Sequence, residues 1–215
     1  MPFKYACFIS YPHGQHTVMK PFIEQLTELL EGFLEPYMDE EVYKDDRLKP
    51  GYKYNESLAE ALCHSICMIV VYSPVYEDRV YCLREYATME KIEEDRFKLM
   101  GQALPADHGM IIPIILRGSD DLPDHIKGNI HFVDFSQFML EETTINRPEY
   151  RKKIEDIAKH IHELRKKFKL IGQDPCGDCP GYKITPEAGL KPWRGKSAIS
   201  RSSTADPFPL REEGR

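Results

Sequence analysis

The sequence has no apolar run long enough to cross a bilayer and no excess of positive charge. Its longest strongly apolar stretch, Ile66 to Tyr72, is less than half of the roughly 18 residues that a membrane-spanning helix needs. Lys and Arg number 29 against 35 Asp and Glu, which gives a net charge of −6. We therefore expect no membrane-embedded protein and no nucleic-acid ligand. Residues 1–11 carry one lysine and no small-residue cleavage site, so a cytoplasmic location is expected.

The common signatures of nucleotide cofactors and of serine nucleophiles are also missing. The chain contains no G-x-G-x-x-G after its first apolar run, no G-x-x-x-x-G-K-[ST] and no G-x-S-x-G. A Rossmann dehydrogenase, a P-loop NTPase and an α/β-hydrolase are therefore disfavoured.

Cysteine is present, but its pattern does not indicate a disulfide framework. Of the six cysteines, four lie within apolar patterned segments: Cys7, Cys63, Cys67 and Cys82. A free cysteine in such a segment behaves as a small hydrophobe, so we expect no disulfide scaffold.

The other two cysteines form an isolated C-x-x-C, Cys176 and Cys179. A zinc site would need two more ligands, and only His160 and His162 on the preceding predicted helix are near in the sequence. We therefore predict no metal and favour two free thiols or a segment that docks a partner.

Strand and helix patterns alternate along the chain, which indicates an α/β fold with a parallel, doubly wound sheet. Strands are predicted at 4–10, 41–44, 66–72, 110–116 and 130–135. Helices are predicted at 17–34, with Thr17 as the cap, and at 54–63, 75–97 and 148–168. Repeated prolines interrupt any pattern after Leu170, so we divide the chain into a domain, 1–170, and a tail, 171–215.

In an open parallel sheet, ligands bind beyond the carboxyl ends of the strands. The residues expected there are Ser10, Tyr11 and His13 after the first strand, Asp45 and Asp46 after the second, and 73–76 after the third. The sequence therefore places a candidate pocket at this edge.

Three segments resemble the Toll/interleukin receptor (TIR) domain family. They are Tyr5–Tyr11 (YACFISY), Val42–Leu62 with its L-x-P-G turn, and Ser73–Glu85 (SPVYEDRVYCLRE), and Ile112–Ile115 resembles the family's fourth strand. The resemblance covers about residues 3–168. It implies a flavodoxin-like fold with five parallel strands and helices on both faces.

Many bacterial and plant TIR domains, and one animal branch, cleave the nicotinamide–ribose bond of NAD+ with the glutamate that matches Glu85. The chemistry is reasonable for one carboxylate, because nicotinamide leaves as a neutral molecule and needs no general acid. The resemblance thus implies an NAD+ glycohydrolase with NAD+ as substrate and no cofactor. Ser10, Tyr11, His13, Asp45 and Tyr81 are the expected substrate-binding residues; the family usually has Trp where this chain has Tyr81.

The resemblance also implies self-association. The loop residues expected to form TIR–TIR contacts are Asp46, Arg47, Leu48, Pro50 and Gly51. Short bacterial members often act in antiphage defence with a separately encoded effector or sensor. Other members are non-enzymatic interaction modules, and a secreted virulence factor is a third alternative.

Each site residue also has an ordinary structural interpretation. A glutamate on a helix is commonly a solvated surface residue, and Tyr81 and Cys82 could pack their helix onto the sheet. His13 could be solvated, and Asp45 and its neighbour could cap a loop.

Overall fold

The computed structural model describes residues 3–13, 18–44, 54–101, 109–127, 131–138, 147–171, 173–190 and 193. Within them lies a five-stranded sheet in the order β2-β1-β3-β4-β5, with every neighbouring pair parallel. The strands are β1 (Tyr5–Ser10), β2 (Glu41–Lys44), β3 (Ser65–Tyr72), β4 (Ile111–Ile115) and β5 (Val133–Asp134). All eight residues of β3 are buried, as expected for a central parallel strand covered on both faces.

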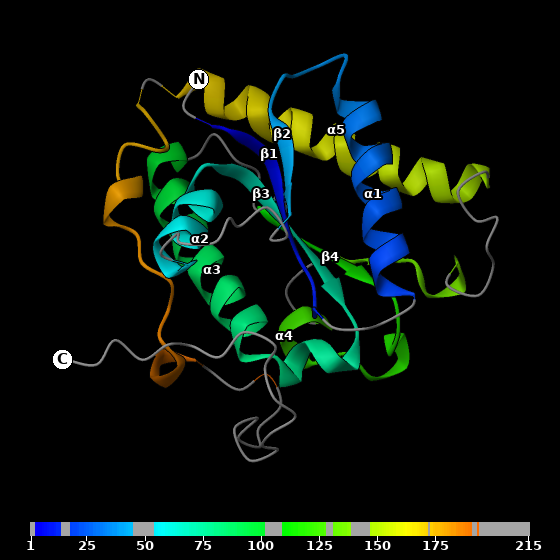
Figure 1. Cartoon of the computed structure of the whole chain (residues 1–215). Helices are drawn as coiled ribbons and strands as arrows, with labels where there is room; N and C mark the ends of the chain where they lie inside the picture. Colours follow the sequence, from blue (N-terminus) through cyan, green and yellow to red (C-terminus); the bar gives the residue numbers. More distant parts are fainter. Residues whose placement is uncertain are drawn as a thin grey trace.

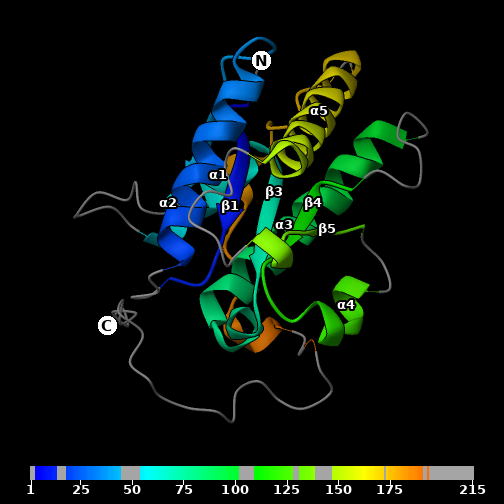
Figure 2. The ribbon, with the colours of Figure 1, turned by 90° about the vertical axis from the view of Figure 1, so that its right-hand side faces the viewer.

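Helices cover both faces of the sheet (Figure 1). They are α1 (Met19–Leu34), α2 (Tyr54–Cys63), α3 (Val80–Met100), α4 (Asp124–Lys127) and α5 (Pro148–Leu170). The helices α1 and α5 lie together on one face, and α2 and α3 lie on the other (Figure 2). The predicted parallel α/β fold with helices on both faces is therefore confirmed. Across the described residues, no helix is long and apolar enough to span a membrane.

The predicted helix over 75–97 is wrong at its start. The chain after β3 forms a separate 3-10 turn, η2 (Pro74–Asp78), and α3 begins only at Val80 because Arg79 is extended, with φ −100° and ψ 102°. This break lets Tyr76 turn into the core, where its side chain is fully buried. At the start of α1, Val18 is the N-cap residue and makes no side-chain cap hydrogen bond, and the predicted cap, Thr17, lies outside the described residues.

The prediction that Cys63 and Cys179 are free thiols is wrong. Cys63, the last residue of α2, is bonded to Cys179 across a separation of 116 residues. Cys7, Cys67 and Cys82 are free and buried, as predicted. Sequence periodicity could not indicate the bond, because it depends on where the C-terminal segment returns to the domain.

The described part of the predicted tail packs against the domain. Cys176 to Leu190 runs along α2 and α3, where Arg84 Nε donates to the carbonyl of Thr185 at 2.8 Å and the Tyr182 hydroxyl donates to Asp95 Oδ2 at 2.8 Å. The boundary at residue 170 stays a prediction, but this segment is in contact with the fold.

Candidate active site

The carboxyl ends of β1 and β3 meet at Glu85, in the second turn of α3. Ser10, the last residue of β1, donates from Oγ to Glu85 Oε2 at 2.6 Å. The hydroxyl of Tyr76, in the turn after β3, lies 2.8 Å from Ser10 Oγ. Either hydroxyl can be the donor of this second bond, and Tyr76 also donates to the carbonyl of Cys82 at 3.3 Å. Tyr76, Ser10 and Glu85 therefore form a hydroxyl chain that ends on the carboxylate.

This chain of hydrogen bonds is almost completely removed from solvent. Glu85 is 1% exposed, Ser10 is 1% exposed and Tyr76 is fully buried. A buried carboxylate is costly unless hydrogen bonds compensate, so the Ser10 hydroxyl stabilises the charge and fixes its orientation. The interpretation of Glu85 as a solvated surface residue is therefore excluded.

The groups around Glu85 are kept neutral. Burial raises the pKa of Tyr76 well above its ordinary value, and the nearby Cys82 and Glu85 raise it further. Burial likewise raises the pKa of the Cys82 thiol, and the charge of Glu85 adds to this effect. Cys82 is thus a protonated packing residue rather than a nucleophile.

Half-buried rings form a row beside this network. The rings of Tyr11 and His13 have centroids 4.4 Å apart, and those of His13 and Tyr81 are 5.4 Å apart. The backbone N–H of His13 donates to the Tyr81 hydroxyl. Tyr81 lies one helical turn before Glu85, so the loop after β1 is attached to the carboxylate-bearing helix.

Tyr81 also remains a neutral phenol. Burial raises its pKa above the ordinary value, and the neighbouring Cys82 and Glu85 raise it further, while the bond from His13 and the cation of Arg79 act in the opposite direction. The ring can therefore present an uncharged aromatic surface beside the carboxylate.

The structure brings together most of the residues that the sequence nominated. Those at the carboxyl ends of β1 and on α3 are Ser10, Tyr11, His13, Tyr81 and Glu85. The nominated loop residues, Asp45, Asp46, Arg47, Leu48, Pro50 and Gly51, lie outside the described residues.

One aromatic residue of this region was missed. Tyr76, within the expected segment 73–76, links β1 to the turn after β3. Trp193 from the C-terminal segment, which was not expected here, stacks on Tyr76 with centroids 5.6 Å apart and planes 24° apart. The rings of Trp193 and Tyr86, the latter on α3, also pack edge to face, with centroids 4.8 Å apart. The sequence feature that could have indicated a role for Trp193 is that it is the one tryptophan of the chain and lies far beyond the last predicted helix.

A family model described as a TIR domain matches residues 7–147, about two thirds of the chain. The chain belongs to the TIR domain family. The matched range includes the last four residues of β1, the hydroxyl chain and all of α3, so the site described above lies within the TIR region.

Other comparisons add little to this assignment. The search of curated proteins found no match. Among solved structures, the chain is similar to the TIR domains of the activated Roq1 resistosome, which directly recognises the pathogen effector XopQ. That likeness has a TM-score of 0.37 and 18% identity, and it covers 72% of this chain and 84% of the other.

Proposed function

We propose that this TIR domain is an NAD+ glycohydrolase in which Glu85 is the catalytic carboxylate. The observation that carries the proposal is the oriented, buried carboxylate at the carboxyl ends of β1 and β3, where ligands bind in open parallel sheets. A charge held in such a place by hydrogen bonds is typical of a functional group.

The proposed reaction needs one negative charge beside the ribose. As the bond between ribose C1′ and the nicotinamide nitrogen breaks, its electron pair leaves with neutral nicotinamide and positive charge develops on the sugar. A fixed carboxylate stabilises that charge, and its preorganisation by Ser10 removes the need to reorient it during the reaction. Water then attacks C1′ and releases one proton, which gives ADP-ribose. An internal nucleophile of the ADP-ribosyl group would give a cyclic product instead.

Tyr81 and its neighbours supply aromatic surface for this chemistry. The ring lies one helical turn from Glu85 and belongs to the row formed with Tyr11 and His13. Stacking on the nicotinamide or on the flat face of the cation would hold the reacting atoms against the carboxylate.

Substrate entry requires movement, because Glu85 is covered in this structure. We propose that a second copy, docked through the loop that includes Leu48, rearranges this cover and completes the site. Assembly would then switch the enzyme on, which fits a role in antiviral defence in the cytoplasm with a separately encoded sensor or effector.

The test is to incubate the purified full chain with NAD+ at several protein concentrations and to identify products by mass. Nicotinamide with ADP-ribose or a cyclic isomer is expected, and Glu85→Gln is the matched inactive control. No NAD+ loss at concentrations where the chain is fully assembled would overturn the proposal.

The second candidate is a non-enzymatic TIR interaction module, and the burial of Glu85 is the observation that favours it. In that case Ser10 and Glu85 would stabilise the junction of β1 with α3. Glu85→Gln would then lower thermal stability, while wild type and variant alike would leave NAD+ intact.

A further inference from the structure

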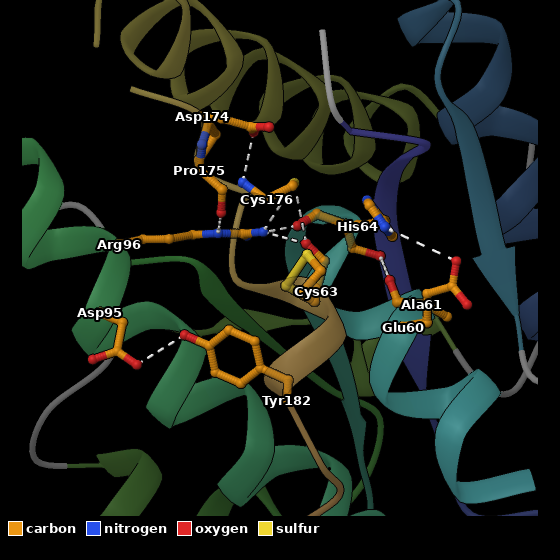
Figure 3. Close-up of a disulfide and its surroundings, with 12 residues drawn as sticks. Glu60, Ala61, Cys63, His64, Asp95, Arg96, Asp174, Pro175, Cys176 and Tyr182 are labelled. Carbon is orange, nitrogen blue, oxygen red and sulfur yellow. Dashed lines mark hydrogen bonds and ion pairs between the residues drawn. A yellow bond between two sulfur atoms is a disulfide. The ribbon is translucent and has the colours of Figure 1, made fainter. Parts of the chain in front are cut away.

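Side chains with zinc-binding chemistry gather where the C-terminal segment meets the end of α2 (Figure 3). The candidate ligand atoms of His64, Cys176 and Cys179 all lie within 4.8 Å of one another. Cys63 joins the same cluster through its bond to Cys179. The last residue of α2, the residue that follows it and a C-x-x-C pair more than a hundred residues later thus converge on one point.

We propose that the reduced chain binds one Zn²⁺ through Cys63, His64, Cys176 and Cys179. Three thiolates and one imidazole form a complete tetrahedral set of the kind used by structural zinc sites. All four positions are filled by protein, so the ion would be structural and would leave no coordination position for a substrate.

The zinc state and the disulfide state exclude each other. A dithiol reductant transfers two electrons and two protons to the Cys63–Cys179 bond, which yields two thiols and an oxidised reductant. Zn²⁺ then displaces the protons of Cys63, Cys176 and Cys179, so three protons are released per ion bound. Either state fastens the C-terminal segment to α2, and conditions that keep thiols reduced select the metal.

The buried guanidinium of Arg96 provides the electrostatic argument for the metal. Arg96 is 2% exposed and donates to the carbonyls of Cys63 and Ser65 and, at 3.7 Å, to Cys176 Sγ. In the disulfide state the described acceptors of this cation are neutral. Zn²⁺ with three thiolates carries one net negative charge, which would place a counterion in contact with the buried cation.

A second contact fits the histidine as a ligand. His64 Nε2 lies 4.0 Å from Glu60 Oε1, and Glu60 is also held by Lys4 at 2.6 Å. Metal-bound histidines commonly have a carboxylate near the ring nitrogen that does not bind the metal, which sets the ring orientation. With Nδ1 as the ligand atom, Glu60 would lie beside Nε2 in this role.

The sequence did not predict this site because its two halves are far apart along the chain. The C-x-x-C pair was visible, but His160 and His162 were the histidines near it in the sequence. In the structure His160 Nε2 is hydrogen-bonded to the carbonyl of Gly109, and the His162 ring packs against Tyr37, so neither histidine belongs to the cysteine cluster.

The experiment measures zinc directly and needs no NAD+, so its result is independent of the proposed catalytic activity. The full chain is prepared in an oxidised form and in a form reduced with a phosphine, and each is titrated with Zn²⁺ against a chromophoric chelator. One zinc per reduced chain is expected, and none in the oxidised form. Co²⁺ should give the intense visible bands of tetrahedral coordination together with sulfur-to-cobalt charge transfer.

Cys176→Ala is the decisive variant because it retains the partners of the disulfide and can be purified folded in the oxidised form. After reduction it should bind zinc at least about a hundredfold more weakly than wild type. Cys67→Ala removes a buried cysteine outside the cluster and should keep one tight zinc.

Three results would overturn the proposal. The first is a reduced wild-type chain that yields all its zinc to the chelator, and the second is a Cys176→Ala variant that binds zinc as tightly as wild type. The third is mass-spectrometric detection of a Cys176–Cys179 disulfide with no bound metal under mild reduction, which would identify the cluster as a thiol–disulfide relay.

Discussion

Ser10 and Glu85, separated by 75 positions, are joined by a 2.6 Å hydrogen bond at the buried carboxyl end of the sheet. The bond connects the last residue of β1 to the second turn of α3, so the sheet itself orients the carboxylate. A charge in this position either serves chemistry or stabilises the fold, and substitutions at the two residues separate these roles.

Glu85→Gln should reduce NAD+ cleavage by about a hundredfold or more while preserving the fold. The amide has the same shape and can still accept the proton of Ser10, but it lacks the charge that faces the developing cation. Turnover and thermal unfolding are measured on the same sample. Activity within a few-fold of wild type would remove Glu85 from the mechanism.

Ser10→Ala should lower turnover by on the order of tenfold to a hundredfold, because that is the change in rate equivalent to the free energy of one hydrogen bond to a charged group. The hydroxyl donates to Glu85 Oε2, so its loss removes the contact that orients the carboxyl group. Turnover and thermal unfolding are measured on the same sample, with Ser10→Thr, which keeps the hydroxyl, as the control. A purely structural role of Ser10 would lower stability and leave turnover per folded protein unchanged.

Tyr81→Ala should raise KM and lower turnover by about three- to tenfold in total, because the aromatic contact with substrate is lost. Tyr81→Trp should retain or improve activity, since it restores the ring that the TIR family usually has there. Tyr81→Phe keeps the ring but removes the acceptor of the His13 N–H, so it reports on that bond alone. Wild-type kinetics in the alanine variant would show that the residue only packs α3 onto the loop.

The strands and most helices were predictable because their signals are local. The unbroken apolar run of β3 and the three- and four-residue spacing of α5 each depend on a short window. The S-P-x-Y and Y-C-x-x-E patterns nominated Glu85 by family resemblance, and its catalytic role stays a prediction. What the sequence missed depends on contacts between distant segments: the break at Arg79 that lets Tyr76 reach Ser10, and the return of Cys179 to Cys63.

Cys179→Ala should reduce the free energy of unfolding by about 2–4 kcal/mol in oxidising, metal-free buffer. The bond closes a loop of 116 residues and so restricts the unfolded chain strongly. Urea denaturation gives the value, and adding a reductant provides the control: it should destabilise the wild type and leave the variant unchanged. Equal stabilities of the two oxidised proteins would show that the bond does not form in solution.

Leu48→Asp should abolish NAD+ cleavage without lowering thermal stability. Leu48 lies outside the described residues, in the segment 45–51 that the sequence predicts to be a loop and that the TIR resemblance assigns to self-association. A charge at the centre of an interface is costly because it must be desolvated, whereas in an exposed loop of a monomer it is nearly neutral. Glu85 is almost fully buried in the single chain, so we expect assembly to expose its carboxylate to the substrate. Specific activity of the wild type should therefore rise more than linearly with protein concentration, and sedimentation should show oligomers that the variant lacks. A specific activity that is flat from dilute to concentrated protein, with Leu48→Asp fully active, would show that the monomer is sufficient.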